Sequence, residues 1–355
     1  MKHNFGAGPC ILPQEVFKKA ADAVLDFNGL SILEISHRSA DFVAVMDEAR
    51  ANVKKALNIP EGYTVLFLQG GASLGFLIAA YNMMGKNKKA GYINTGTWST
   101  KAIKEAKNIG IDVVELASSK DKGFSYIPKG FDIPDDIDFL HFTSNNTIVG
   151  TQFKAFPKTN VPLVCDMSSD IFSKEINVGD FDLIYAGAQK NLGPAGATLY
   201  IVKDSILGKS TADVIPSYLD LSIHADKDSM FNTPPVFSVF VSNLNLNHML
   251  SIGGVETIAK DVREKADLLY AEIDSNPLFE GTVAKEDRSD MNVTFKCKDD
   301  SLTDAFNKAW NAANIVGLKG HRSVGGFRAS MYNALSKESV KVLVECMKDF
   351  TSKNA

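Results

Sequence analysis

The chain has 355 residues, of which 45% are hydrophobic and 23% are charged, and its formal net charge is −4. This composition is that of an ordinary globular protein, and the length suggests about two domains. The mild acidity and the lack of a Lys/Arg block argue against nucleic acid as a partner, and the apolar runs are too short to span a membrane. With no apolar signal segment and only four scattered cysteines, we expect a cytoplasmic protein without a structural metal.

Apolar strand-like runs alternate with helical patterns along the chain. We expect helices at about 14–27, 41–57, 74–84, 98–108, 236–250, 256–273, 302–313 and 337–350. We expect strands at about 64–68, 91–94, 112–116, 139–143, 161–164, 181–186, 197–202 and 291–296. Near-continuous apolar strands between helices predict an α/β fold with a mainly parallel sheet covered on both faces.

The predicted organisation is a large α/β domain at 15–255 and a smaller α+β domain at 256–355, which the segment 1–14 joins. The helix at 236–250 is expected to bridge the two. In parallel sheets, ligands lie at the carboxyl ends of the strands. Several polar residues follow predicted strands, namely Trp98, Asn145 to Thr147, Asp166 and Lys190.

The most informative stretch runs from Ile184 to Gly196, where one lysine, Lys190, lies in a small-residue turn between two apolar runs. Desolvation would disfavour its ammonium form and lower its pKa. A partly neutral lysine can attack a carbonyl and form a Schiff base. The alternative is an ordinary solvated turn lysine.

Two further features suit a ring-shaped anionic ligand. Gln69-Gly-Gly-Ala-Ser73 links a strand to a helix, which presents backbone N–H groups to a phosphate, although a structural glycine turn fits as well. Asp166 ends a buried strand, where its carboxylate would need a cationic partner, unless it caps the next helix. Trp98 could stack on a flat ring, or serve as plain core.

Two basic clusters look suited to anions. His37-Arg38 lies in a short predicted loop, and His321-Arg322 precedes Arg328 in a glycine-rich stretch. Arginine offers a planar fork of donors to carboxylate or phosphate, and histidine adds another donor. The alternative is that these are scattered surface side chains.

Three motifs together resemble the phosphoserine aminotransferase family, a class V, fold-type I family dependent on pyridoxal phosphate (PLP). They are Ala186-Gly-Ala-Gln-Lys-Asn-Leu-Gly-Pro-Ala-Gly196, Ser229-Met-Phe-Asn-Thr-Pro-Pro235 and Lys319-Gly-His-Arg-Ser-Val-Gly-Gly-Phe-Arg-Ala-Ser-Met-Tyr-Asn-Ala334. The resemblance runs nearly end to end and implies a large domain with a seven-stranded-type sheet.

The resemblance implies a role for each matching residue. Lys190 would bind PLP covalently and act as the catalytic base, and Asp166 would pair with the ring nitrogen. Trp98 would stack on the ring, and Thr147 would bond near its phenolic edge. The cofactor phosphate would be held by Ala72, Ser73 and Gln189, and by Asn232 and Thr233 of a second subunit.

The resemblance also implies substrates and a partner. Arg328 would hold the substrate α-carboxylate, and the distal anion would be held by His37, Arg38, His321 and Arg322. The enzyme would be a homodimer acting on glutamate and 3-phosphohydroxypyruvate in L-serine biosynthesis. Some family members also act in pyridoxine biosynthesis, on 3-hydroxy-2-oxo-4-phosphooxybutanoate. Some carry Arg where this chain has Ser73, so the affinity for phosphoserine is expected to be lower here.

Two alternatives stay open. Another class V PLP enzyme, such as a different aminotransferase or a cysteine desulfurase, would share the scaffold, but a desulfurase needs a reactive cysteine on a mobile loop and Lys319 to Ser330 has none. A non-catalytic sugar- or phosphate-binding protein would be expected to lack the lysine at 190.

Overall fold

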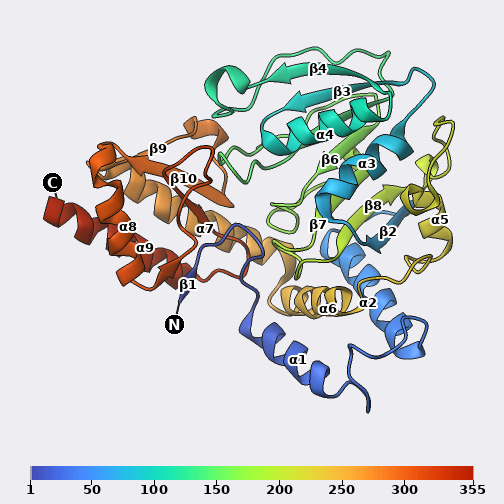
Figure 1. Cartoon of the computed structure of the whole chain (residues 1–355), viewed down its shortest axis with the longest axis horizontal. Coiled ribbons are helices and arrows are strands. Elements are labelled where there is room, and N and C mark those ends of the chain that lie inside the picture. Colours follow the sequence, from blue (N-terminus) through green and yellow to red (C-terminus); the bar gives the residue numbers. More distant parts are fainter. Residues whose placement is uncertain (1, 355) are drawn as a thin grey trace.

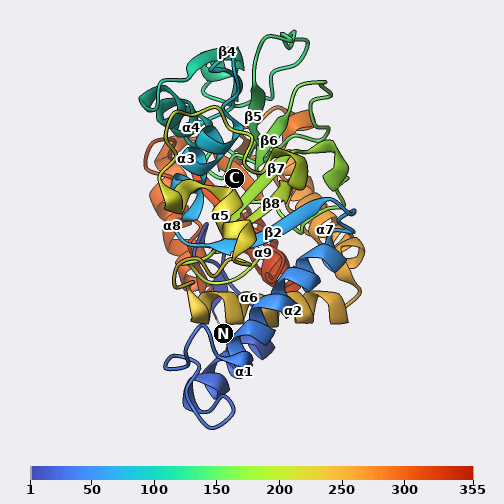
Figure 2. The ribbon, with the colours of Figure 1, turned by 90° about the vertical axis from the view of Figure 1, so that its right-hand side faces the viewer.

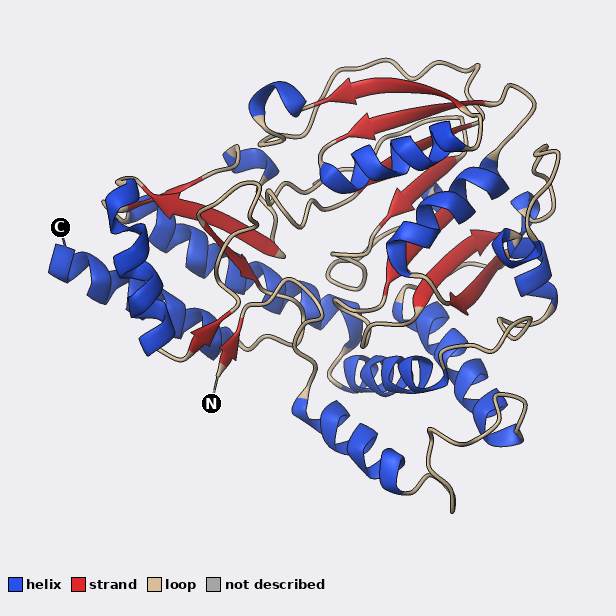
Figure 3. Ribbon diagram, viewed as in Figure 1, coloured by secondary structure: helices blue, strands red, loops and turns tan. Residues whose placement is uncertain are grey.

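The structure is a computed structural model that describes residues 2–354. The strands of its central sheet are β2 (Tyr63–Leu68), β3 (Lys89–Asn94), β4 (Asp112–Ser118), β5 (Phe139–Thr143), β6 (Leu163–Asp166), β7 (Leu183–Gly187) and β8 (Thr198–Lys203). They lie in the order β2-β8-β7-β6-β5-β3-β4 (Figures 1 and 3). The run from β7 to β4 is parallel, and only β8 pairs antiparallel with its neighbours, which confirms the predicted α/β sheet.

Helices cover both faces of this sheet. They are α1 (Gln14–Leu25), α2 (Ala40–Ala56), α3 (Gly71–Met83), α4 (Thr97–Asn108), α5 (Leu221–Asp226), α6 (Val236–Ser251) and α7 (Gly254–Ser275). α3, α4 and α5 lie on one face, and α1, α2 and α6 lie on the other (Figure 2). Successive residues of one strand alternate between the two cores, with Val65 and Phe67 in one and Leu66 and Leu68 in the other. Burial on both faces explains the unbroken apolar runs in the sequence.

The C-terminal part is a smaller α+β unit beside the large sheet (Figure 1). Its elements are β9 (Phe279–Gly281), β10 (Asn292–Cys297), α8 (Thr303–Ala312), β11 (Ile315–Val316), β12 (Phe327–Ser330) and α9 (Lys337–Asn354). β12, β10 and β9 form an antiparallel sheet, and the N-terminal strand β1 (His3–Asn4) pairs with β11. The division at 255 and 256 stays a prediction.

The expectation that α6 bridges the two parts is wrong. The buried apolar residues of α6 all lie in the core of the large sheet, because this helix is apolar on most of its surface and packs as an inner layer. α7 makes the connection instead, since Val262 lies in that core and Ala266 and Leu269 lie in the C-terminal core. Gly253 and Gly254, both at positive φ, form the turn between the two helices.

Within 2–354, no helix combines the length and apolar character that crossing a membrane requires. The same residues contain no group of three or more His, Cys, Asp or Glu side chains arranged to hold a metal ion.

Candidate active site

A cavity of about 340 Å³ lies at the carboxyl edge of the large sheet, beside the starts of α3 and β12. Its volume is in the range of small-molecule sites. Polar side chains from both parts of the chain converge on it. Nine of the predicted site residues line it: Ala72, Ser73, Trp98, Thr147, Asp166, Gln189, Lys190, His321 and Arg328.

Lys190 lies in the turn between β7 and β8, and only 8% of it is exposed. Its Nζ donates a hydrogen bond to Thr147 Oγ1 at 2.7 Å. Burial lowers the pKa of the Lys190 ammonium from 10.5 to about 8, against the opposing effect of the Asp166 charge. The reading of Lys190 as a solvated turn lysine is therefore wrong, and a useful fraction of its amine is neutral near physiological pH.

Asp166 is the last residue of β6 and is 3% exposed. Its Oδ1 accepts hydrogen bonds from the backbone N–H and the hydroxyl of Ser168, at 2.9 and 2.6 Å. A turn rather than a helix follows, so the alternative that Asp166 caps a helix is wrong. Burial raises the pKa of the Asp166 carboxyl, while the bonds from Ser168 and the charge of Lys190 lower it. A cationic ligand in the cavity would stabilise the carboxylate.

The glycine turn after β2 leads directly into α3. The helix begins at Gly71, three residues before the predicted start, because Gly70 adopts φ of 103° and caps it. The N–H groups of its first turn have no partner within the helix, and the helix dipole adds positive potential there. Ala72 and Ser73 lie in this turn at the cavity, which is suited to a phosphate group.

Three polar groups at the cavity lack partners within the described part of the chain. They are the buried hydroxyl of Thr143 and two N–H donors, the buried Nε1 of Trp98 and the buried Nε of Arg328. Arg328 donates one hydrogen bond from Nη1 to Thr147 O at 3.2 Å, and burial lowers the pKa of its guanidinium. Because unsatisfied buried donors are costly, both N–H donors are available to a ligand.

The five remaining predicted residues do not line the cavity of this single chain. Arg322 is exposed next to His321, and Arg38 is exposed in the loop between α1 and α2, beside the half-buried His37. Asn232 and Thr233 are also exposed, although Thr233 O accepts a hydrogen bond from Gln69 Nε2 at 2.8 Å. Their predicted roles stay predictions.

Sequence reasoning missed several lining residues. Ser168 and Ser169 follow β6 at the same carboxyl edge that marked Asp166, so the strand-end rule could have included them. Ala7 and Gly8 carry no such signal, because only the fold brings the N-terminal segment to the cavity. A Cβ on Gly8 would lie 3.6 Å from Lys190 Cγ, and its φ of 134° also favours glycine.

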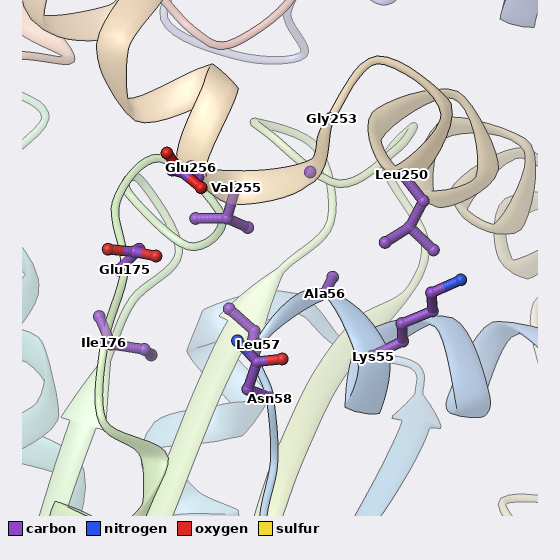
Figure 4. A pocket seen from close by; sticks show the side chains of 11 residues that line it. Lys55, Ala56, Leu57, Asn58, Glu175, Ile176, Leu250, Gly253, Val255 and Glu256 are labelled. Atoms are coloured by element: carbon purple, nitrogen blue, oxygen red, sulfur yellow. The ribbon is translucent and has the colours of Figure 1, made fainter.

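A second hollow, of about 230 Å³, lies between the end of α2 and the start of α7 (Figure 4). Its charged lining residues Lys55, Glu175 and Glu256 are exposed, and Glu256 pairs with Lys260 one helical turn away. Solvated charges on helix ends have no need of a ligand. None of the predicted site residues lines this hollow.

The sheet order, the buried lysine after β7 and the acid ending β6 together define a class of protein. A family model described as aminotransferase class-V matches residues 3–343. The chain belongs to the class-V aminotransferase family.

Individual relatives narrow the placement within that family. A protein named phosphoserine aminotransferase from Flavobacterium johnsoniae is 60% identical over 355 residues, covering 99% of each chain. The solved phosphoserine aminotransferase from Bacillus circulans subsp. alkalophilus is 43% identical with a TM-score of 0.96, over 100% of this chain and 99% of that one. A PLP-bound phosphoserine aminotransferase from Trichomonas vaginalis is 34% identical with a TM-score of 0.92, over 98% of this chain and 100% of that one.

The buried amine of Lys190 predicts a pH-dependent stability. Its folded pKa of about 8 lies below its unfolded value, so the cost of burying the charge is full below pH 8. That cost, roughly 3 kcal/mol from the size of the shift, fades as the pH rises toward the unfolded pKa. We expect Lys190→Met to raise the unfolding free energy of the cofactor-free protein at pH 7, by less than this because the bond to Thr147 is lost, and the gain to shrink at pH 10.

Urea denaturation at the two pH values measures this difference. Lys19→Met is the matched control, because the Lys19 side chain is 57% exposed and its replacement removes no buried charge. A gain for Lys190→Met that is equal at pH 7 and pH 10 would contradict the assigned burial cost.

Proposed function

We propose that this chain catalyses the phosphoserine aminotransferase reaction. In this reaction the amino group of glutamate passes reversibly to 3-phosphohydroxypyruvate, giving 3-phosphoserine and 2-oxoglutarate for L-serine biosynthesis. One observation carries the proposal: the buried, partly neutral amine of Lys190 shares a cavity with the buried acid Asp166. The similarity to phosphoserine aminotransferases over nearly the whole chain supports the choice of substrates.

The donors at the cavity fit PLP. The free N–H groups at the start of α3 suit its phosphate, together with Ser73 and Gln189. Asp166 suits a protonated ring nitrogen, because the buried carboxylate gains from a cation. The flat face of Trp98 suits the ring, and Thr147 lies where the lysine amine ends. When bound, PLP withdraws electrons from the α-carbon of an attached amino acid.

Each residue around the cofactor site has its own proposed role. Lys190 holds the cofactor through its amine, and after release the same Nζ moves a proton at the substrate α-carbon. Its pKa of about 8 lets it serve as acceptor and donor in turn near neutral pH. Thr147 orients the amine at 2.7 Å, and Ser168 fixes the Asp166 carboxylate.

Two basic side chains from the C-terminal part suit the substrate. The unpartnered Nε of Arg328 points to the binding of the α-carboxylate, and His321 also lines the cavity. Burial and the charges of Arg328 and Arg322 lower the pKa of His321. An anion bound between these groups would favour their charged forms and so raise the pKa of His321 again. Such donors serve the phosphate of one substrate and the side-chain carboxylate of the other.

We propose a homodimer in which each subunit completes the site of the other. Asn232 and Thr233 would bind the cofactor phosphate of the second subunit, and His37 and Arg38 the distal anion. Exposed apolar side chains lie close in sequence to both pairs of residues. Leu30 and Leu33, which precede His37 and Arg38, are 54% and 62% exposed, and Phe231, which precedes Asn232, is 40% exposed. Apolar exposure of this kind is typical of surfaces that a partner covers.

A cysteine desulfurase is less well supported. Cys10, beside the lysine turn, donates from its thiol to Lys190 O, and burial raises its pKa to about 12. A thiol of that pKa is a poor nucleophile at neutral pH. The cytoplasm is the proposed location, in keeping with a biosynthetic enzyme with free cysteines.

Replacing Lys190 tests the proposal most directly. We expect Lys190→Ala to lower turnover of phosphoserine with 2-oxoglutarate by several orders of magnitude, because the variant loses both the cofactor attachment and the base. A coupled assay measures turnover, with circular dichroism to show that the fold is kept. Lys101→Ala is the control, since Lys101 is a surface lysine 4.6 Å from the Trp98 ring and should keep activity. Equal turnover of wild type and Lys190→Ala would refute the assignment.

Mixing two inactive variants tests the shared site. We expect activity to reappear when Lys190→Ala subunits are refolded with His37→Ala/Arg38→Ala subunits, because each mixed dimer then has one complete site. Either variant refolded alone serves as the control. If the mixture stays as inactive as its components, the two basic residues act within their own subunit or not at all.

Restoring an arginine at position 73 tests substrate affinity. Ser73 is exposed at the start of α3, so a new guanidinium there would form a solvated ion pair with a phosphate, worth about 1 kcal/mol or less. We expect Ser73→Arg to lower the KM for phosphoserine a few-fold, and the uncharged Ser73→Gln to leave it unchanged. A KM for phosphoserine that is unchanged or higher in Ser73→Arg would contradict the predicted loss of a ligand.

A further inference from the structure

A fully buried lysine, Lys265, lies in the middle of α7, outside the cavity. Its Nζ lies 2.8 Å from Asp261 Oδ2 and 2.8 Å from Leu335 O. The same atom lies 3.4 Å from each of the carbonyl oxygens of Tyr332 and Asn333. Four oxygen atoms therefore surround one ammonium group, and three of them belong to the backbone segment Tyr332–Leu335.

This arrangement favours a positive charge at Nζ. Carbonyl and carboxylate oxygens only accept hydrogen bonds, and an ammonium offers three donors where a neutral amine offers two. Burial lowers the pKa of Lys265, whereas Asp261 raises it and so favours the charged form. An apolar side chain here would remove the 2.8 Å donor of the buried Leu335 O, which is costly.

The segment that Lys265 holds has two contacts with the candidate active site. Asn333 N donates to Asn191 Oδ1 at 3.0 Å, and Asn191 directly follows Lys190. The Tyr332 hydroxyl donates to Ala7 O at 2.9 Å, and Ala7 lines the cavity. The segment also follows β12, which carries Arg328. One segment thus contacts the lysine turn, the N-terminal wall and the strand with the substrate-binding arginine.

We propose that Lys265 is a positioning residue of the transamination site: a tethered cation that fixes the backbone of Tyr332–Leu335 and, through Asn333 and Asn191, the turn that carries Lys190. This inference rests on the proposed function for its role in turnover. The placement of the lysine turn can be tested without any substrate.

The test compares Lys265→Met, which is close in shape but uncharged, with Lys260→Met on the same helix. The Lys260 side chain is 71% exposed, and its one ion pair within residues 2–354 is with Glu256, so its loss should change nothing at the site. In Lys265→Met we expect faster amide hydrogen exchange in residues 330–336, and kcat for phosphoserine lowered roughly ten- to hundredfold with a smaller change in KM. Unchanged exchange and unchanged kcat would overturn the proposal.

A pH profile separates positioning from a merely structural role. The rate at which cofactor-free protein captures PLP depends on the neutral amine of Lys190, whose pKa is about 8. A loosened turn lets water reach the amine, so the midpoint of this profile should move upward in Lys265→Met and stay in place in Lys260→Met. Loss of thermal stability with an unmoved midpoint and normal kcat would assign Lys265 to stability alone and overturn the proposal.

A second variant decides the matter if Lys265→Met does not fold. Asp261→Asn keeps the ammonium but removes its charged partner, and the Asp261 side chain is 43% exposed, so the change is milder. We expect the same shifts in exchange and in the capture midpoint, but smaller. A wild-type enzyme inactive on phosphoserine would refute the proposed function, whereas exchange and PLP capture would still report on the positioning role.

Discussion

The structure depends on keeping one amine, that of Lys190, away from water. Apolar strands on both sides of its turn remove solvent, which lowers its pKa to about 8. Without that burial the group would stay an ammonium and could neither attack a carbonyl nor accept a proton near neutral pH. The same burial raises the pKa of the Asp166 carboxyl. The site therefore holds an amine that suits an electrophilic carbonyl and a carboxylate that a cationic ring would stabilise.

Parallel strand order brings these groups together. β6 and β7 are neighbours, with Asp166 paired in register with Tyr185, so the acid at the end of one strand lies beside the turn that follows the other. β5 is next to β6, and the segment that follows β5 places the Thr147 hydroxyl at the same edge, 2.7 Å from the lysine amine. Residues separated by more than forty positions in sequence thus meet without any long-range motif, because the carboxyl ends of parallel strands share one edge.

Much of this could be predicted from the sequence, and the failures have physical reasons. Strand runs and strand-end polar residues carry a local signal, so the pattern makes Asp166 and Lys190 candidates, and only the family resemblance implies their roles. The pattern predicts the start of α3 three residues too late because two consecutive glycines suppress helix propensity, while Gly70 at positive φ in fact caps the helix. The pattern also predicts α6 rather than α7 as the bridge, because tertiary packing, which the sequence pattern does not contain, decides which helix spans two cores. Ala7 reaches the cavity only through the fold.

The residues proposed to bind the cofactor and those proposed to bind the substrate come from different parts of the chain, so their relative position matters for the proposed chemistry. Apolar packing keeps the two parts of the chain together but does little to stop them sliding past each other. Buried hydrogen bonds form in one relative position only, so they also prevent sliding. Asn145 Nδ2, at the edge of the large sheet, donates to Asn292 Oδ1 of β10 at 2.7 Å, and both side chains are buried. This pair, the bond from Arg328 Nη1 to Thr147 O and the bond from Thr294 Oγ1 to Val149 O are directional contacts between the two parts, and the proposed role of Lys265 would add to them. Polar groups buried far from any ligand are thus part of how the site keeps its geometry.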